Sequence, residues 1–183
     1  MEKVFFKEEQ QFKQPWVWLI LVPAFVSVLG VLAFAFDKQL IEGEKLGDKL
    51  MLDTGLLVFG IFIILLMSGL TILFYKMKLI VEIRSNGINY RYPPMINKFR
   101  NIPPESIESY EVREYKPIRE YGGWGIKNHG KPRKRRKYGS AYNVSGNIGL
   151  QLYLKDGKKT LFGTQRSAAI KYAMAKLMET KTH

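Results

Sequence analysis

The fold of this chain is decided by TGLLVFGIFIILLMSGLTILFY, residues 54–75, a run of 22 residues without a charged side chain. A second run of this kind, WVWLILVPAFVSVLGVLAFAF, occupies residues 16–36 and has 21 residues. A helix needs roughly 20 apolar residues to cross the hydrocarbon core of a bilayer, so both runs are long enough. In a chain of 183 residues, too little other surface remains to bury two uniformly apolar helices as core helices. The sequence therefore predicts two transmembrane helices.

The first run has one feature of a cleaved signal peptide, because Ala33-Phe34-Ala35 has the small-x-small form of a cleavage site. The apolar run, however, is longer than the roughly 7–15 residues of a signal core, and residues 2–13 before it have a balanced charge. We therefore predict a retained membrane span.

The distribution of basic residues predicts the orientation of this helical hairpin. Residues 1–15 and the loop 37–53 hold three lysines each, whereas residues 76–183 hold the other 23 of the 29 Lys and Arg residues. Positive charge is retained on the cytoplasmic side of a membrane. We expect a multi-pass protein with a cytoplasmic tail (1–15), a transmembrane hairpin (16–75) and a cytoplasmic domain (76–183). Neither span contains an ionisable residue, which favours an anchor over a transporter or proton relay.

The pattern changes to β-strands after Lys76. KLIVEIR (78–84) is followed by Asn86-Gly87 and by INYRY (88–92), and an Asn-Gly between such runs is a strong hairpin signal. A second hairpin is predicted for GLQLYLK (149–155) and KKTLFGT (158–164), joined at Asp156-Gly157.

The last segment, QRSAAIKYAMAKLMET (165–180), has helical periodicity, and Thr164 before it can cap a helix. This helix could lie on a membrane or bind a partner, but a small antiparallel sheet needs an apolar cover, so we expect it to close the open end of the sheet. Its predicted apolar stripe consists of Ala169, Ile170, Ala173, Met174, Leu177 and Met178.

Several phrases resemble the bacterial pleckstrin-homology-like (PH-like) domains of small membrane proteins. They are INYRYPP (88–94), IPPESIESYEVREY (102–115) and GLQLYLKDGKKTLFGTQ (149–165), which runs into the helix. The resemblance covers roughly residues 77–180 and implies a partly open barrel of two antiparallel sheets capped by the helix. It also implies a bacterial inner membrane. It implies no activity, because folds of this kind bind lipids, peptides or proteins in different members. The expected fold class is thus an α+β membrane protein, a transmembrane hairpin followed by a PH-like antiparallel barrel or sandwich with a C-terminal capping helix.

A basic loop, residues 127–138, contains KPRKRRK at 131–137. Such a run contacts nucleic acid, an anionic membrane, an acidic protein, or only water. The membrane spans and the lack of a nucleic-acid-binding motif argue against nucleic acid. An anionic cytoplasmic leaflet attracts such segments, so we predict contact with lipid headgroups, with the aromatic residues Tyr121 and Trp124 at the interface. The predicted cationic contacts are Lys131, Arg133, Lys134, Arg135, Arg136 and Lys137.

The sequence shows no spacing of residues that is typical of a catalytic site. It has no cysteine, and its two histidines, His129 and His183, have no spaced partners that would suggest a triad or a metal site. The segment YGGWG (121–125) lacks the spacing of a phosphate-binding loop. We therefore predict no enzyme activity, cofactor or metal, and a binding module instead. The first alternative is a membrane-anchored assembly factor that recruits a protein through a sheet edge or its spans. The second alternative is a small membrane enzyme.

Overall fold

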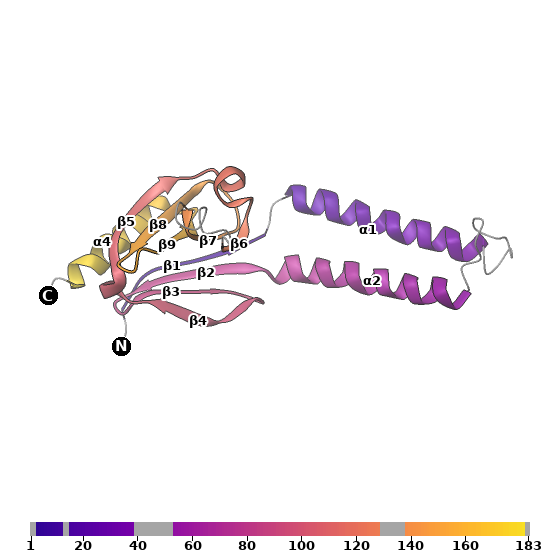
Figure 1. Cartoon of the computed structure of the whole chain (residues 1–183), viewed down its shortest axis with the longest axis horizontal. Coiled ribbons are helices and arrows are strands. Elements are labelled where there is room, and N and C mark those ends of the chain that lie inside the picture. Colours follow the sequence, from indigo (N-terminus) through magenta and orange to yellow (C-terminus); the bar gives the residue numbers. More distant parts are fainter. Residues whose placement is uncertain (1–2, 13–14, 39–52, 129–137, 182–183) are drawn as a thin grey trace. The chain divides into compact units, whose positions relative to one another are not determined.

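The computed structural model of the chain describes residues 3–12, 15–38, 53–128 and 138–181. The chain divides into two compact units (Figure 1). One unit is Lys13–Tyr75. The other combines Met1–Phe12 with Lys76–His183, so segments from both ends of the sequence build one domain.

The first unit contains two helices, α1 (Pro15–Phe36) and α2 (Asp53–Lys76). Their stretches Val17–Phe36 and Val58–Lys76 are long and apolar enough to cross a membrane, with mean hydropathies of 2.6 and 2.5, and 6% of each is buried within the described structure. Helices in the core of a soluble domain would be mostly buried. Gly60 of α2 faces α1 closely, since a methyl group added there would lie 3.3 Å from the Phe36 ring. The two predicted helices are confirmed, and their insertion into a membrane stays a prediction.

The second unit begins with a four-stranded antiparallel sheet in the order β1-β2-β3-β4. The predicted first hairpin is confirmed as β2 and β3, in which Gly87 takes a φ of +125° that favours glycine. The strands are β1 (Val4–Gln11), β2 (Lys78–Arg84), β3 (Gly87–Tyr92) and β4 (Ile96–Ile102).

Strand β1 lies within residues 1–15, which the sequence predicts to be a tail. The strand alternates between buried and exposed residues, but its buried side carries Glu8 and Gln10 as well as Phe6. Those polar side chains have partners inside the domain. Glu8 accepts hydrogen bonds from the Thr164 hydroxyl (2.6 Å) and the Gln165 amide (2.8 Å). Polar residues on the inward face hid the alternation by which strands are recognised.

A five-stranded sheet follows, in the order β5-β8-β9-β7-β6. The second predicted hairpin is confirmed as β8 and β9, and the segments on either side of the basic loop form the antiparallel pair β6 and β7. The strands are β5 (Ile107–Glu114), β6 (Gly125–Asn128), β7 (Ser140–Asn143), β8 (Ile148–Leu154) and β9 (Lys159–Gly163), with a short helix η2 (Pro104–Ser106) before β5 and a π-helical turn η3 (Pro117–Tyr121) after it.

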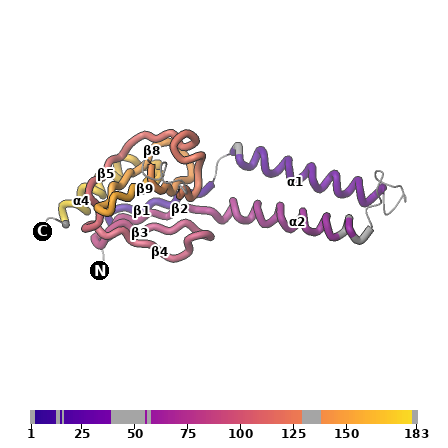
Figure 2. Tube along the Cα trace, viewed as in Figure 1, coloured from indigo at the N-terminus to yellow at the C-terminus, as the bar shows by residue number. Residues whose placement is uncertain are grey.

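This second sheet corrects one feature of the expected barrel of two antiparallel sheets. Strands β7 and β9 pair in parallel, whereas β9 pairs antiparallel with β8 on its other side. The described strands form two separate sheets that do not close into a barrel. The sheets lie in two layers (Figures 1 and 2), and aromatic rings of Tyr90, Tyr142 and Phe162 meet between them at centroid distances of 4.8–5.5 Å.

Helix α4 (Ser167–Lys181) contacts strands of both sheets, namely β1, β2, β5 and β8. The central residues of its predicted apolar stripe (Ile170, Ala173, Met174 and Leu177) are buried, which confirms that the helix covers the domain. Thr164 lies just before the helix. Its hydroxyl accepts a hydrogen bond from the Arg166 amide (3.0 Å) while donating to Glu8.

Candidate functional site

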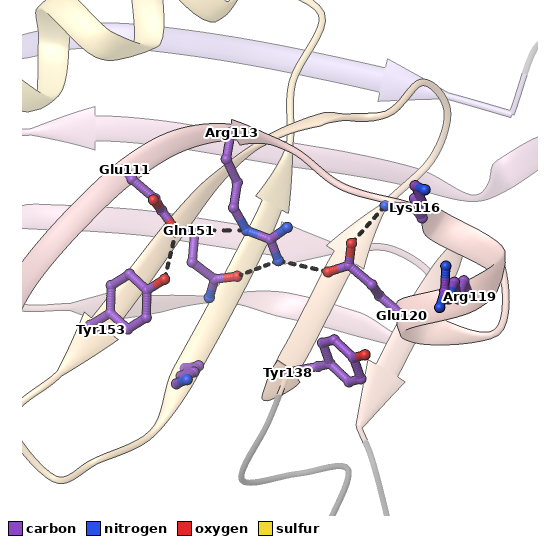
Figure 3. Close-up of a pocket in the computed structure, with 9 residues that line it drawn as sticks. Glu111, Arg113, Lys116, Arg119, Glu120, Tyr138, Gln151 and Tyr153 are labelled. Carbon is purple, nitrogen blue, oxygen red and sulfur yellow. Dashed lines mark hydrogen bonds and ion pairs between the residues drawn. The ribbon is translucent and has the colours of Figure 1, made fainter.

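The candidate site lies on the outer face of the five-stranded sheet. Successive side chains of a strand point to opposite faces, and in β8 the buried Leu150 and Leu152 face the other sheet. Gln151 and Tyr153 therefore project from the outer face. Glu111 of β5 is the register partner of Gln151, so β5 and β8 together supply a row of polar side chains (Figure 3).

The π-helical turn η3 covers part of this face. Its last residue, Tyr121, is buried against Tyr115, Ala141 and Leu161, and Tyr138 packs against the same group. Gly122 ends the turn in the left-handed conformation, with a φ of +74°, and its amide donates to the Ile118 carbonyl. The turn thus holds its cationic residues beside the polar row of the sheet.

An open groove of about 480 Å³ remains between the turn and the sheet. Its walls come from β5, from Lys116 and the turn that follows it, from Tyr138 ahead of β7, and from β8 and β9. Nine residues line it: Glu111, Arg113, Lys116, Arg119, Glu120, Tyr138, Gln151, Tyr153 and Lys159.

Arg113 is held firmly at the floor of this groove (Figure 3). Its guanidinium donates to the Glu120 carboxylate (2.8 Å) and the Gln151 side-chain carbonyl (3.1 Å). Burial by itself raises the pKa of the Glu120 carboxyl, but the hydrogen bonds from Arg113 and the Lys116 amide, together with the charges of these two residues, outweigh it and leave the pKa lowered. Burial likewise opposes the charge of Arg113, but the hydrogen bond to Glu120 and the nearby charges of Glu120 and Glu111 together leave the pKa of Arg113 raised. The ion pair is therefore charged at neutral pH.

Two other cations of the groove are not committed in this way. Within the described part of the chain, the exposed Lys116 and Arg119 side chains form no hydrogen bond or ion pair. Lys159 Nζ lies over the Tyr153 ring, 5.4 Å from its centroid. The Tyr153 hydroxyl donates to Glu111 (2.6 Å). The groove therefore presents cationic groups to solvent, while the polar side chains at its floor are already hydrogen-bonded to one another.

The sequence-predicted contact residues fall into three groups. The six cations of 131–137, Lys131 to Lys137, and His129 lie outside the described residues. Trp124 is partly exposed and donates from its indole nitrogen to the Gly146 carbonyl (3.0 Å). Tyr121, predicted at a membrane interface, is instead placed in the interior, where burial raises its pKa to about 12 and its hydroxyl donates to the Tyr138 carbonyl (3.1 Å).

The basic run and the groove are nevertheless close along the chain. Tyr138, which lines the groove, is bonded directly to Lys137, the last residue of the run. The other end of the loop leaves from β6, whose last residue is Asn128 and which pairs with β7. The structure therefore brings the start and the end of the basic loop to the sheet that carries the groove.

Sequence reasoning did not find Arg113, Lys116, Arg119 and Glu120 as site residues. Their signal was available only in part, because period-two alternation places Glu111 and Arg113 on one face of a strand. The charged side chains of the turn 117–121 join the site only when the turn folds back over the sheet. No three His, Cys, Asp or Glu side chains of the described residues gather as a metal site. The arrangement is suited to holding an anion by hydrogen bonds and charge.

No protein-family model, no curated protein and no solved structure matches this chain. The resemblance to PH-like domains thus stays a prediction, and the function must be argued from the site.

Proposed function

We propose that this chain is a membrane-anchored, non-catalytic binding module whose β-domain contacts anionic lipid headgroups. The observation that carries the proposal is the groove with the two uncommitted cations Lys116 and Arg119, at the sheet from which the basic loop 127–138 leaves and to which it returns. We place both termini in the cytoplasm of a bacterial cell, at its inner membrane.

The architecture supports anchoring by two membrane crossings. Strand β1 precedes α1 and strand β2 follows α2, yet the two strands pair along the register from Val4–Arg84 to Gln11–Lys78. Paired strands lie on one side of any membrane, so the chain between them must cross an even number of times. Two apolar helices satisfy this condition.

Electrostatics supports lipid headgroups as the ligand. A Lys or Arg near an anionic leaflet gains roughly 1 kcal/mol, within a Debye length of about 10 Å. The chain has a net charge of +13, and six of its cations lie in 131–137. Even a large discount for distance and screening leaves enough attraction to draw the loop to an anionic surface.

A distance measurement on the full-length chain in nanodiscs tests this proposal. The chain has no cysteine, so Asn128→Cys, at an exposed position beside the loop, gives a single labelling site. We expect energy transfer from this label to a headgroup acceptor to be greater in anionic than in neutral discs at low salt. High salt should remove the difference. Equal transfer in both lipids at low salt contradicts the proposal.

A matched pair of charge variants identifies the contact. Lys131, Lys134 and Lys137, changed together to Gln, should remove most of the difference between anionic and neutral discs. The control variant changes Lys98, Lys155 and Lys171 to Gln, three exposed lysines of the same domain. Equal losses in the two variants would show that net charge, and not the basic run, draws the domain to the lipid.

A second candidate function, a protein-assembly factor, is favoured by β4. This strand is at the edge of its sheet, and Phe99 on it is 43% exposed. An edge strand offers backbone groups that another chain can pair with. Association through β4 would survive high salt and would be weakened by Phe99→Asp. The lipid contact, in contrast, would be lost at high salt and would depend on the basic run and not on the Phe99 ring.

A further inference from the structure

We infer that the groove is a discrete site for a phosphate monoester, with Lys116 and Arg119 as the residues that hold the phosphate group. The inference rests on the proposed anion-binding function and deepens it. The basic loop would provide diffuse attraction to a charged surface, whereas the groove would recognise one chemical group.

The charges of the groove match a dianion. Its lining contains four cationic side chains and two carboxylates, and both carboxylates are committed to Arg113, with Glu120 at 2.8 Å and Glu111 at 3.7 Å. Arg113 therefore has little charge left to offer a ligand. Lys116 and Arg119 supply the positive charge offered to a ligand. A phosphate monoester carries about −1.5 to −2 charges at pH 7 and three strong acceptor oxygens, while a diester carries one charge.

The turn that contains Arg119 and follows Lys116 is held in place before any ligand arrives. The Glu120 carboxylate accepts a hydrogen bond from the Lys116 amide (2.8 Å), and the Glu120 amide donates back to the Lys116 carbonyl (2.8 Å). Because Glu120 is also bonded to Arg113, the turn is fixed to β5 of the sheet. Binding then orders only the ends of two side chains, which lowers its entropic cost.

The groove has room for more than the phosphate. Its volume of about 480 Å³ lies in the usual range of small-molecule sites. Tyr138 and Tyr153 add aromatic surface to its walls (Figure 3). A phosphate on a polyol or glycerol backbone fits this mixture of charge and ring surface. Such a group occurs both in lipid headgroups and in free metabolites.

Calorimetric titration of the full-length chain in neutral nanodiscs tests the site, with glycerol 3-phosphate as the probe and glycerol as the uncharged control. We expect glycerol 3-phosphate to bind and glycerol not to bind. Changing Lys116 and Arg119 together to Gln removes two charge-assisted contacts and should weaken binding by about tenfold or more. The control, Lys155 and Lys171 changed together to Gln, removes the same charge from exposed positions and should change affinity less than about twofold.

Two results would overturn the inference. One is that glycerol 3-phosphate does not bind to the wild-type chain and that the chain also shows no preference for phosphatidic acid, a monoester lipid, over phosphatidylglycerol, a diester lipid. The other is equal weakening in the two double variants, which would show general charge attraction without a site. Neither result would change the difference in energy transfer between anionic and neutral discs, which depends on Lys131, Lys134 and Lys137. The failure of the groove and the failure of the proposed function are thus distinguishable.

A lipid arm separates the two sources of the phosphate. The Asn128 label is followed in discs of phosphatidic acid, a monoester, and of phosphatidylglycerol, a diester, at equal surface charge. A preference for phosphatidic acid that is lost when Lys116 and Arg119 are changed to Gln assigns the site to a lipid headgroup. Binding of the free probe without this preference assigns it to a soluble phosphate.

Discussion

At the scale of single residues, Arg113 organises the outer face of the five-stranded sheet. Its guanidinium connects β5 to η3 through Glu120 (2.8 Å) and to β8 through Gln151 (3.1 Å). Side-chain exposure is low on both sides of the ion pair, 25% for Arg113 and 16% for Glu120, so solvent screens it only in part. One partly buried cation therefore positions the turn that contains Arg119 and follows Lys116.

Glu120→Gln should lower the free energy of unfolding of the domain by about 1–3 kcal/mol, because a hydrogen bond between charged groups is lost and Arg113 stays partly buried. The folded-state pKa of Glu120 lies below its ordinary value. Its stabilising effect is therefore present above the unfolded-state pKa of about 4.3 and is lost as pH falls through the folded-state pKa. Hydrogen exchange of β8 amides measures both effects. The difference between wild type and variant should shrink in acid, and a difference independent of pH would contradict this account.

Gly139, next to Tyr138, is a position where there is no room for a Cβ atom. Its φ is +75°, and an added Cβ would lie 2.1 Å from the Lys159 carbonyl oxygen. Gly139→Ala should separate β7 from β9 and move Tyr138 out of the groove. Gly122→Ala is the matched control, since Gly122 has a φ of +74° and nothing within 4 Å of its added Cβ. The control should cost only the left-handed penalty of about 1–2 kcal/mol. Equal losses of thermal stability would show that the close approach has no effect.

At the scale of elements, β1 is the segment that completes the domain. It covers one edge of β2, donates from the Gln10 side chain to the Gly163 carbonyl (2.7 Å), and holds the segment before α4 through Glu8. Lys7 Nζ also lies 3.4 Å from the buried Glu82 carboxylate of β2. Removal of β1 would leave buried polar groups of the rest of the domain without partners, which costs about 1–3 kcal/mol for each group.

The pairing of β1 with β2 makes the domain separable from the helices. Gln11 and Lys78 are register partners, and such partners in an antiparallel pair lie roughly 5 Å apart. A two-residue Asn-Gly turn between Gln11 and Lys78 should therefore replace residues 12–77 and give a soluble folded domain. Residues 78–183 alone should aggregate or unfold. Dispersed amide NMR spectra of both proteins check this prediction, and a well-dispersed spectrum of the shorter one would contradict it.

At the scale of the whole molecule, the sheet constrains the topology of the chain. Segments from before and after the two apolar helices fold into one unit, so they must lie on the same side of a membrane. This argument is independent of the count of basic residues. That count then predicts that this side is the cytoplasm, because residues 76–183 hold most of the Lys and Arg residues.

Labelling of single cysteines checks the topology. Gln11→Cys and Lys155→Cys lie at exposed positions of the domain, and Gly47→Cys lies in the sequence between the helices. In intact cells, an impermeant maleimide should label only the third, and lysis should expose the other two. Labelling of Gln11→Cys and Lys155→Cys from opposite sides would contradict the pairing of β1 with β2. Labelling of both in intact cells would instead reverse the predicted orientation.

Much of the fold could be predicted from the sequence because its signals are local. The helices at 16–36 and 54–75 follow from unbroken apolar runs, and the hairpins at Asn86-Gly87 and Asp156-Gly157 follow from turn chemistry between alternating strands. The apolar stripe of α4 was readable in the same way. Each of these features depends on residues within about one element of each other.

Other features were decided only by the tertiary structure. The strand role of residues 4–11 depends on partners more than 60 residues away, with Glu8 and Gln10 satisfied by Thr164 and Gly163. The parallel pairing of β7 with β9 depends on where β9 inserts. The groove also depends on distant segments, since the turn 117–121 must fold back over the sheet before Lys116 and Arg119 lie beside the residues of β8 and β9. Local sequence predicts local geometry, whereas buried polar contacts and the juxtaposition of charges arise only when distant segments pack together.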